Sequence, residues 1–236
     1  MIRVFVDRSV EDNRTCLVED EFWNHYLTTV RRLGEGDEVE VVGPDRLGRA
    51  EILSEEPLTL AVGKTRSVQR PAHDLVLAQA LTRKKKFEQS VKLGTELGVT
   101  EFVPLITERT VREPRDPEKQ RDRWKKIAVD AARISRRETL PKIALPVSID
   151  QGIELLEPYE VVLVGDAEGA PVEDVLKPEG TSTGLFVGPE GGFTSEERTQ
   201  LLESGAQPVG LKAENLRAET ASIALLVLIQ ARMGVL

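Results

Sequence analysis

The sequence is poor in the residues that build metal and disulfide sites. Cys16 is the only cysteine among 236 residues, which excludes an intrachain disulfide and makes a thiolate metal cluster unexpected. The two histidines, His25 and His73, have no carboxylate or cysteine nearby at ligand spacing, so we expect no metal. A Ser/His/Asp arrangement and a G-x-S-x-G elbow are both missing, which argues against covalent hydrolysis.

Long apolar runs are missing as well. No stretch approaches the ~20 residues that span a bilayer, and the first residues, MIRVF, lack the apolar core of a signal peptide. A composition of 40% hydrophobic and 31% charged residues is typical of soluble globular proteins. The sequence therefore predicts a cytoplasmic protein without a membrane partner.

Acidic residues are in excess, with a net charge of −8, but the charge is unevenly distributed. Residues 64–142 hold 20 of the 32 Lys and Arg and only 11 of the 40 Asp and Glu. A basic middle between acidic ends indicates a face that meets phosphates. For any single cluster, a helix face exposed to solvent is an alternative explanation.

The first 68 residues predict a small β-barrel domain. Short β-type runs at 39–42, 49–53 and 58–62 alternate with Gly, Pro and Asp turns. One helix, over about 20–32, interrupts them. A polar segment whose run is interrupted by Pro71, residues 67–72, is the predicted domain boundary.

Residues 73–236 predict an α/β domain. All-apolar runs indicate strands covered on both faces, and strands that alternate with helices indicate a parallel sheet joined by crossover helices. The predicted strands are 75–81, 101–106, 161–164 and 185–187, and the predicted helices are 86–97, 117–135 and 221–229.

Two segments near the C-terminus carry the strongest functional signal. Strand 185–187 runs into Gly188-Pro189-Glu190-Gly191-Gly192, where glycines let a ligand approach the main chain. The second segment, 211–221, leads into an apolar helix with Glu219 and Thr220 in or near its first turn. A plain strand-to-helix turn and ordinary helix N-terminal chemistry are the alternative explanations. The spacing fits neither a dinucleotide fingerprint nor a phosphate loop.

Both segments resemble the cofactor loops of the SPOUT methyltransferases, and the sequence most resembles the bacterial 16S ribosomal RNA uridine-N3 methyltransferase family, RsmE. Thr95-Glu96-Leu97-Gly98-Val99 and Glu108-Arg109 also match, and the similarity spans nearly the whole chain. It implies a SPOUT-type α/β domain with a C-terminal trefoil knot, preceded by a PUA-like β-barrel. It further implies S-adenosylmethionine as cofactor, 16S rRNA of the 30S subunit as substrate, and a homodimer that packs its C-terminal helix at the interface.

The resemblance also implies site residues. Arg217 and Glu219 are the candidate catalytic residues, while the proton acceptor stays open between Glu190, Glu219 and water. In Lys212-Ala213-Glu214 the sequence departs from the family, which has a glycine there. The implied cofactor-binding residues are Leu163, Gly165, Val187, Gly188, Pro189, Glu190, Gly191, Gly192, Leu211, Leu216, Arg217, Glu219, Thr220 and Ala221.

Basic residues are candidates for RNA contact, and all of those named here match the family except Lys84, which stands where the family has a glycine. Arg83, Lys84 and Lys86 follow a strand and open a helix, a favourable place for a phosphate. The other candidates are Arg32, Arg109 and Arg137. The alternatives are a solvated run for the residues at 83–86, the helix dipole for Arg137, a carboxylate partner for Arg109 and a structural role for Arg32. Two further functions stay open: a non-catalytic RNA-binding or ribosome-assembly protein on a SPOUT scaffold, and a SPOUT methyltransferase that acts on tRNA.

Overall fold

The structure is a computed structural model that describes residues 1–82, 85–110, 113–178, 182–211 and 216–236. Arg83, Lys84 and the Lys212-Ala213-Glu214 segment lie outside these ranges. Contacts divide the chain into two compact units. The N-terminal unit holds Met1–Arg70 and Ala132–Thr139, and the C-terminal unit holds Pro71–Ala131 and Leu140–Leu236.

The N-terminal unit contains a five-stranded sheet of order β1-β3-β4-β5-β2. β1 pairs with β3 in parallel and the other pairs are antiparallel. Along β4 and β5 alternate residues face the core, which Val39, Val41, Ile52 and Leu60 help to fill. The strands are β1 (Ile2–Phe5), β2 (Thr15–Leu17), β3 (Glu38–Val42), β4 (Arg46–Glu55) and β5 (Leu58–Ser67).

The predicted helix over 20–32 is shorter than expected. Asp20 caps it by accepting from the backbone N–H of Phe22 at 2.9 Å, and α1 (Glu21–His25) continues into a π-helical turn, η1 (Tyr26–Val30). Arg32 lies beyond the helix in the left-handed region, at a φ of 57°. The helix therefore ends at Val30, before Arg31 and Arg32, which lie within the predicted range.

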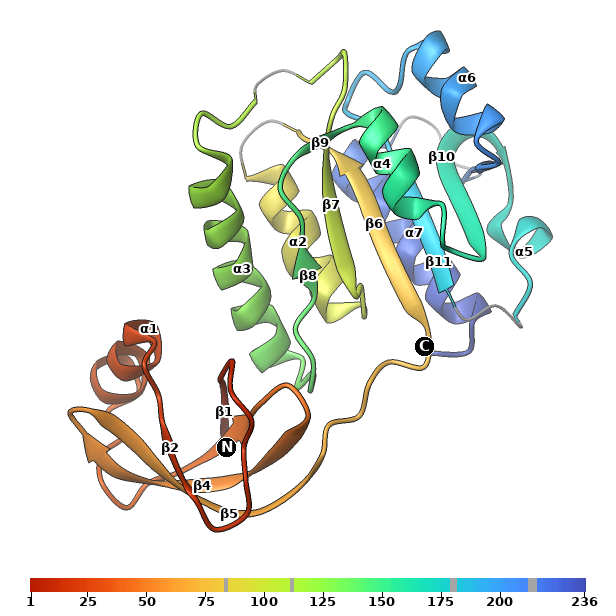
Figure 1. Cartoon of the computed structure of the whole chain (residues 1–236). Helices are drawn as coiled ribbons and strands as arrows, with labels where there is room; N and C mark the ends of the chain where they lie inside the picture. The colour runs from red at the N-terminus through yellow and green to blue at the C-terminus, as the bar shows by residue number, and fades with distance from the viewer. Residues whose placement is uncertain (83–84, 111–112, 179–181, 212–215) are drawn as a thin grey trace. The chain divides into compact units, whose positions relative to one another are not determined.

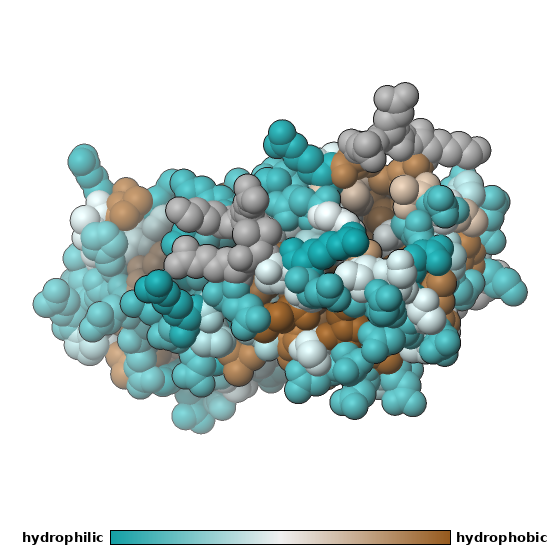
Figure 2. All heavy atoms as spheres, turned by 90° about the horizontal axis from the view of Figure 1, so that it is seen from above, coloured by the Kyte–Doolittle hydropathy of each residue, from teal (hydrophilic) through white to brown (hydrophobic). Residues whose placement is uncertain are grey.

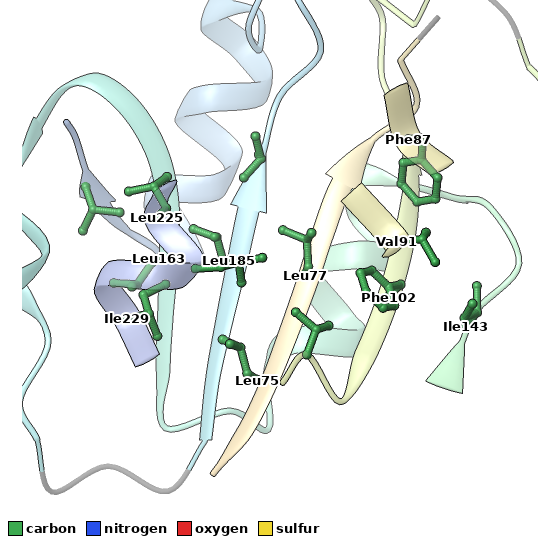
Figure 3. Packing of buried hydrophobic residues seen from close by; sticks show 14 of the residues in the cluster. Leu75, Leu77, Phe87, Val91, Phe102, Ile143, Leu163, Leu185, Leu225 and Ile229 are labelled. Carbon is green, nitrogen blue, oxygen red and sulfur yellow. The ribbon is translucent and has the colours of Figure 1, made fainter. Parts of the chain in front are cut away.

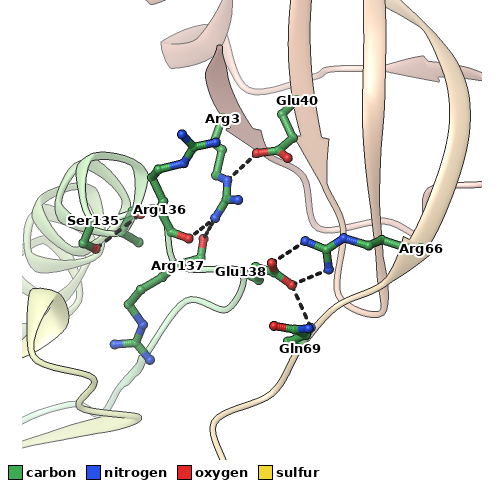
Figure 4. A network of polar contacts seen from close by, with 9 residues as sticks. Arg3, Glu40, Arg66, Gln69, Ser135, Arg136, Arg137 and Glu138 are labelled. Atoms are coloured by element: carbon green, nitrogen blue, oxygen red, sulfur yellow. Dashed lines mark hydrogen bonds and ion pairs between the residues drawn. The ribbon is translucent and has the colours of Figure 1, made fainter. Parts of the chain in front are cut away.

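A buried arginine ties the segment 132–139 into the N-terminal unit (Figure 4). Arg3 is only 6% exposed, forms an ion pair with Glu40, and donates through Nη1 to the carbonyl oxygens of Arg136 and Arg137. A buried guanidinium is stable only where its donors are paired, and Arg3 has such partners.

A second ion pair holds the same segment. The Glu138 carboxylate accepts from both terminal nitrogens of Arg66 and from the backbone N–H of Gln69 at 2.8 Å (Figure 4). These hydrogen bonds lower the pKa of Glu138, with the Arg66 guanidinium as the main cause.

The C-terminal unit is an α/β fold with a parallel sheet of order β12-β10-β11-β6-β7-β8, and β9 also pairs with β7 (Figure 1). Every recorded strand pair in it is parallel, as the alternation predicted. The strands are β6 (Asp74–Ala80), β7 (Glu101–Ile106), β8 (Lys142–Ile143), β9 (Val147–Ser148), β10 (Val161–Ala170), β11 (Ser182–Val187) and β12 (Gln207–Val209). The helices are α2 (Lys86–Glu96), α3 (Pro117–Ile134), α4 (Ile149–Leu156), α5 (Val172–Val175), α6 (Ser195–Glu203) and α7 (Ala218–Arg232).

Helices cover both faces of this sheet. On β6, Leu75 and Leu77 pack with α2, α3, α5 and α7 (Figure 3), whereas Val76 and Ala78 pack with α4 and α6. The period of two along the strand produces these two cores. In the described ranges, no helix combines the length and hydropathy needed to cross a membrane.

Parallel strands end at one edge of the sheet, and this edge brings distant segments together. The segments that follow β6, β7 and β11, and the first turns of α2, α6 and α7, all lie there (Figure 1). Seen from above, this face shows apolar atoms in its centre with hydrophilic side chains around them (Figure 2). In open α/β sheets such an edge is the usual place for a ligand.

Candidate active site

The glycine loop, residues 188–192, leaves the buried end of β11 and closes tightly on itself. A Cβ on Gly188 would lie 3.0 Å from the backbone nitrogen of Phe193, so no larger residue fits without movement. Gly192 has a φ of 69° and donates its N–H to the carbonyl oxygen of Pro189 at 2.9 Å. The loop therefore presents main chain rather than side chains at Gly191 and Gly192, which are exposed.

A capping box connects this loop to α6. Thr194 accepts from the Glu197 N–H at 3.2 Å, and Glu197 Oε2 accepts from the Thr194 N–H at 2.8 Å. Glu197 is 8% exposed, and its Oε1 accepts from the backbone N–H of Glu108 at 2.8 Å. Glu197 was not predicted from the sequence, although the T-x-x-E spacing before a helix is a recognisable signal.

The second predicted segment forms the start of α7. Leu216 and Arg217 are exposed, Arg217 is the N-cap, and the helix begins at Ala218, three residues before the predicted start. Glu219 lies in the first turn and is 9% exposed, while its Oε2 has no hydrogen-bond partner. A buried carboxylate oxygen without a partner is unusual, because its desolvation is uncompensated.

Lys86, in the first turn of α2, joins the two predicted segments. Its Nζ lies 3.2 Å from Glu190 Oε1 in the glycine loop and 3.5 Å from Glu219 Oε1 in α7. The three side chains are 30%, 29% and 10% exposed, so this cluster is partly shielded from water. The structure thus brings together the glycine loop, the start of α7 and Lys86 at the start of α2.

The remaining predicted cofactor residues lie on neighbouring strand ends. Leu163 is fully buried in β10, Gly165 is in register with Val209 of β12, and Leu211 follows β12. The backbones of β10 and β12 approach each other closely here, since a Cβ on Gly169 would lie 2.4 Å from the carbonyl carbon of Val209. Our sequence analysis had not noted Gly169.

The predicted RNA-contact residues are divided between the units. Arg32 and Arg137 belong to the N-terminal unit, and Lys86 and Arg109 to the C-terminal unit. Burial lowers the pKa of Arg137 to about 10. Arg109 is exposed, yet its Nη1 donates to the carbonyl oxygen of Gly191 and lies 3.5 Å from that of Phe193.

Gln79 is a buried polar residue that the sequence analysis missed. It is fully buried near the end of β6, in register with Val187 of β11 and Pro104 of β7. Neither Oε1 nor Nε2 has a partner. Since Leu77 and Leu81 pack on the face of α2 and α7, the strand period places Gln79 on that same face.

Known RNA methyltransferases are similar to this chain in sequence and in fold. Residues 69–230 match the family described as RNA methyltransferase domain. The chain is 34% identical to the ribosomal RNA small subunit methyltransferase E of Synechocystis, over 88% of this chain and 70% of that protein. It is 30% identical to the protein of that name in Aquifex aeolicus, over 95% and 97% of the two chains. A crystal structure of such an enzyme from Neisseria gonorrhoeae, bound to S-adenosyl methionine, has the same fold, with a TM-score of 0.88, 23% identity and coverage of 98% and 97%.

Proposed function

This chain belongs to the ribosomal RNA small subunit methyltransferase E family, and from that membership we propose that it methylates N3 of a uridine in 16S rRNA, with S-adenosylmethionine as the donor. The observation that carries this proposal is the junction at Lys86. One ammonium group joins the glycine loop and the start of α7, which are the two segments with the family's cofactor motifs.

The residues at this junction fit such a cofactor. The glycine loop offers main-chain groups without Cβ atoms at Gly191 and Gly192, which suits a ligand held close to the backbone. Glu219 Oε2 is a buried acceptor without a partner, which suits a cationic ligand or a proton donor. When bound, S-adenosylmethionine supplies a methyl group already activated by its sulfonium centre. The chain's main task is therefore alignment.

Two residues have chemical roles in this proposal. The N3 proton of uridine must leave, and Glu219 accepts it through Oε2; Glu190 is the less suitable acceptor because its side chain is more exposed. Arg217 is exposed at the N-cap of α7, next to Glu219, and stabilises the negative charge that deprotonation leaves on the uracil ring.

The nucleic-acid partner is 16S rRNA in the small subunit. Lys86, Arg32 and Arg137, together with Arg83 and Lys84 outside the described ranges, supply positive charge for phosphates. The Watson–Crick edge that holds N3 is paired in a duplex, so the target uridine is unpaired or flipped out. The N-terminal unit serves as a PUA-like RNA-binding module.

Two structural features belong to the same proposal. The C-terminal unit has a trefoil knot of the SPOUT type, with the segments after β10, β11 and β12 around the cofactor. The enzyme is a homodimer that packs α7 against its partner, because Val227 and Leu228 expose apolar surface on this helix (38% each).

A methylation assay tests the function. We expect the purified chain to bind S-adenosylmethionine in calorimetry and to transfer labelled methyl groups to 30S subunits from a strain that lacks it. Mass spectrometry of the product should find N3-methyluridine. Cofactor binding without transfer would favour a non-catalytic assembly protein, and label in tRNA instead would favour a tRNA enzyme. Failure to bind the cofactor would refute the proposal.

A further inference from the structure

The segment that follows β7 contacts the glycine loop and its exit at two separate points. At the first point, the buried carboxylate of Glu197 joins two backbone N–H groups, that of Glu108 and that of Thr194, each at 2.8 Å. Glu108 lies just beyond β7, and Thr194 lies two residues beyond the glycine loop. One side chain of α6 thereby fixes the exit of the loop to the segment that follows β7, two strands away from β11 in the sheet.

Arg109 makes the second contact, at the tip of the loop. Its Nη1 donates to the carbonyl oxygen of Gly191, and its Cδ would lie 3.3 Å from a Cβ placed on Gly191. The aliphatic part of the arginine therefore packs against the glycine while the guanidinium binds the carbonyl. A charged donor gives a stronger hydrogen bond than a neutral one.

The glycine loop needs support of this kind. Gly191 and Gly192 are exposed and carry no side chain that could pack. The Gly192 N–H donation to Pro189 is the only backbone hydrogen bond recorded within the described loop residues. Glycine has the largest conformational freedom in the unfolded and mobile states. A loop that is already ordered binds its ligand more tightly than one that must become ordered on binding.

We propose that Arg109 and Glu197 are positioning residues, which hold the glycine loop in the conformation that binds the cofactor. The proposal rests on the function proposed above. It assigns Arg109 to cofactor affinity, whereas the family resemblance suggested RNA contact. Arg109 then acts through the Gly191 carbonyl, and Glu197 through the exit of the loop.

The experiment measures cofactor affinity and RNA affinity separately. We would compare the full-length wild type with Arg109→Ala, Arg109→Lys and Glu197→Gln, using calorimetry for S-adenosylmethionine and filter binding for unmethylated 30S subunits over a range of salt concentrations. Glu196→Gln is the matched control, since Glu196 is an exposed residue in the same turn of α6. Circular dichroism checks that each variant is folded.

We expect Arg109→Ala and Glu197→Gln each to raise the cofactor dissociation constant about tenfold, as the loss of one charge-assisted hydrogen bond predicts. Arg109→Lys should keep part of the affinity, and Glu196→Gln should keep all of it. The affinity for 30S subunits and its salt slope should stay unchanged. Because Glu197 is buried, a shared effect of the two variants cannot come from RNA contact.

Two results would overturn the proposal. One is a smaller salt slope and weaker 30S binding in Arg109→Ala with unchanged cofactor affinity, since that pattern marks a phosphate contact. The other is unchanged cofactor affinity in both Arg109→Ala and Glu197→Gln. A wild-type protein that binds no cofactor would refute the proposed function itself, so the two failures are distinguishable.

Discussion

The two units differ in how completely their buried polar side chains are paired. In the N-terminal unit, the buried guanidinium of Arg3 has a carboxylate and two carbonyl oxygens as partners. In the C-terminal unit, Gln79 and Glu219 are just as buried but keep side-chain atoms without partners. Among the described residues, every buried side-chain atom recorded as unpartnered lies in the C-terminal unit.

The difference separates groups that stabilise the fold from groups that are available for chemistry. Removal of one partner from a buried ion pair strongly destabilises a fold, because the other charge stays buried without compensation. Unpaired buried groups already reduce stability, so their removal costs little or is favourable. Such groups persist where function needs them. The predictions below test this contrast, from the largest expected effect to the smallest.

Arg3→Met should destabilise the protein most. The change leaves Glu40 and two carbonyl oxygens without their partner, and removal of one member of a buried ion pair costs about 3–5 kcal/mol. Urea unfolding of the full chain measures the loss. Arg14→Met is the control, because Arg14 pairs with Glu11 on the surface and should change stability by less than about 0.5 kcal/mol. Equal losses of stability in Arg3→Met and Arg14→Met would show that the buried ion pair of Arg3 matters no more than a surface pair.

Glu219→Gln should affect catalysis far more than stability. The substitution removes the proposed proton acceptor, so the single-turnover rate of methyl transfer should fall about a hundredfold. The unfolding free energy should change little, because the amide oxygen of glutamine can still accept from Lys86 in place of Oε1, and Oε2 has no partner to lose. Glu203→Gln, at the end of α6, is the control and should keep the rate. A Glu219→Gln enzyme with the wild-type rate would exclude this carboxylate as the acceptor.

Gln79→Leu should leave stability unchanged or raise it by about 1 kcal/mol, because an apolar side chain of similar size replaces an unpaired amide. Gln230→Leu is the matched comparison. Gln230 is equally buried in α7, but its Nε2 donates to the carbonyl oxygen of Leu97 at 2.7 Å. This second variant should lose stability. Thermal unfolding measures the stability of both variants. A clear loss of stability in Gln79→Leu would show that the Gln79 amide is paired in solution.

The smallest effect concerns pH. The pKa of Glu138 is lowered in the folded state, so its pairing with Arg66 stabilises the protein above the ordinary carboxyl pKa. That contribution is lost as the pH falls through about 4 and below. Glu138→Gln should therefore flatten the decline of the urea midpoint between neutral and acid pH. Parallel curves for the two proteins would show that the pair contributes no stability.

Much of the fold could be predicted from the sequence because its signals are local. The mainly apolar run at 101–106 is β7 as predicted, and the glycine after residue 97 marks the end of α2. The three-residue edge strand β2 was missed, since it is too short for a periodic pattern. The π-helical turn η1 was missed because the hydrophobic period does not distinguish it from an α-helix.

The candidate site was predictable only in part. The glycine loop and Glu219 are visible in motifs, whereas the role of Lys86 depends on a contact 104 residues away, with Glu190. Gln79 looked like one polar residue in an apolar strand, and only the structure shows that its amide has no partner. Pairwise distances between remote segments decide such roles, and a single sequence does not contain them.

The pairing of α2 with α7 has a consequence for synthesis on the ribosome. The hydrogen bond from Gln230 to Leu97 spans 133 residues. During synthesis, α2 therefore lacks its contacts with α7 until α7 has been made. A nascent chain that has not yet reached residue 218 lacks Glu219 and lacks α7, which covers part of one face of the sheet. Long sequence separations slow folding and expose such surfaces to aggregation. The C-terminal unit therefore becomes competent only after α7 has been synthesised, so truncation before residue 218 should be as damaging as truncation much earlier in this unit.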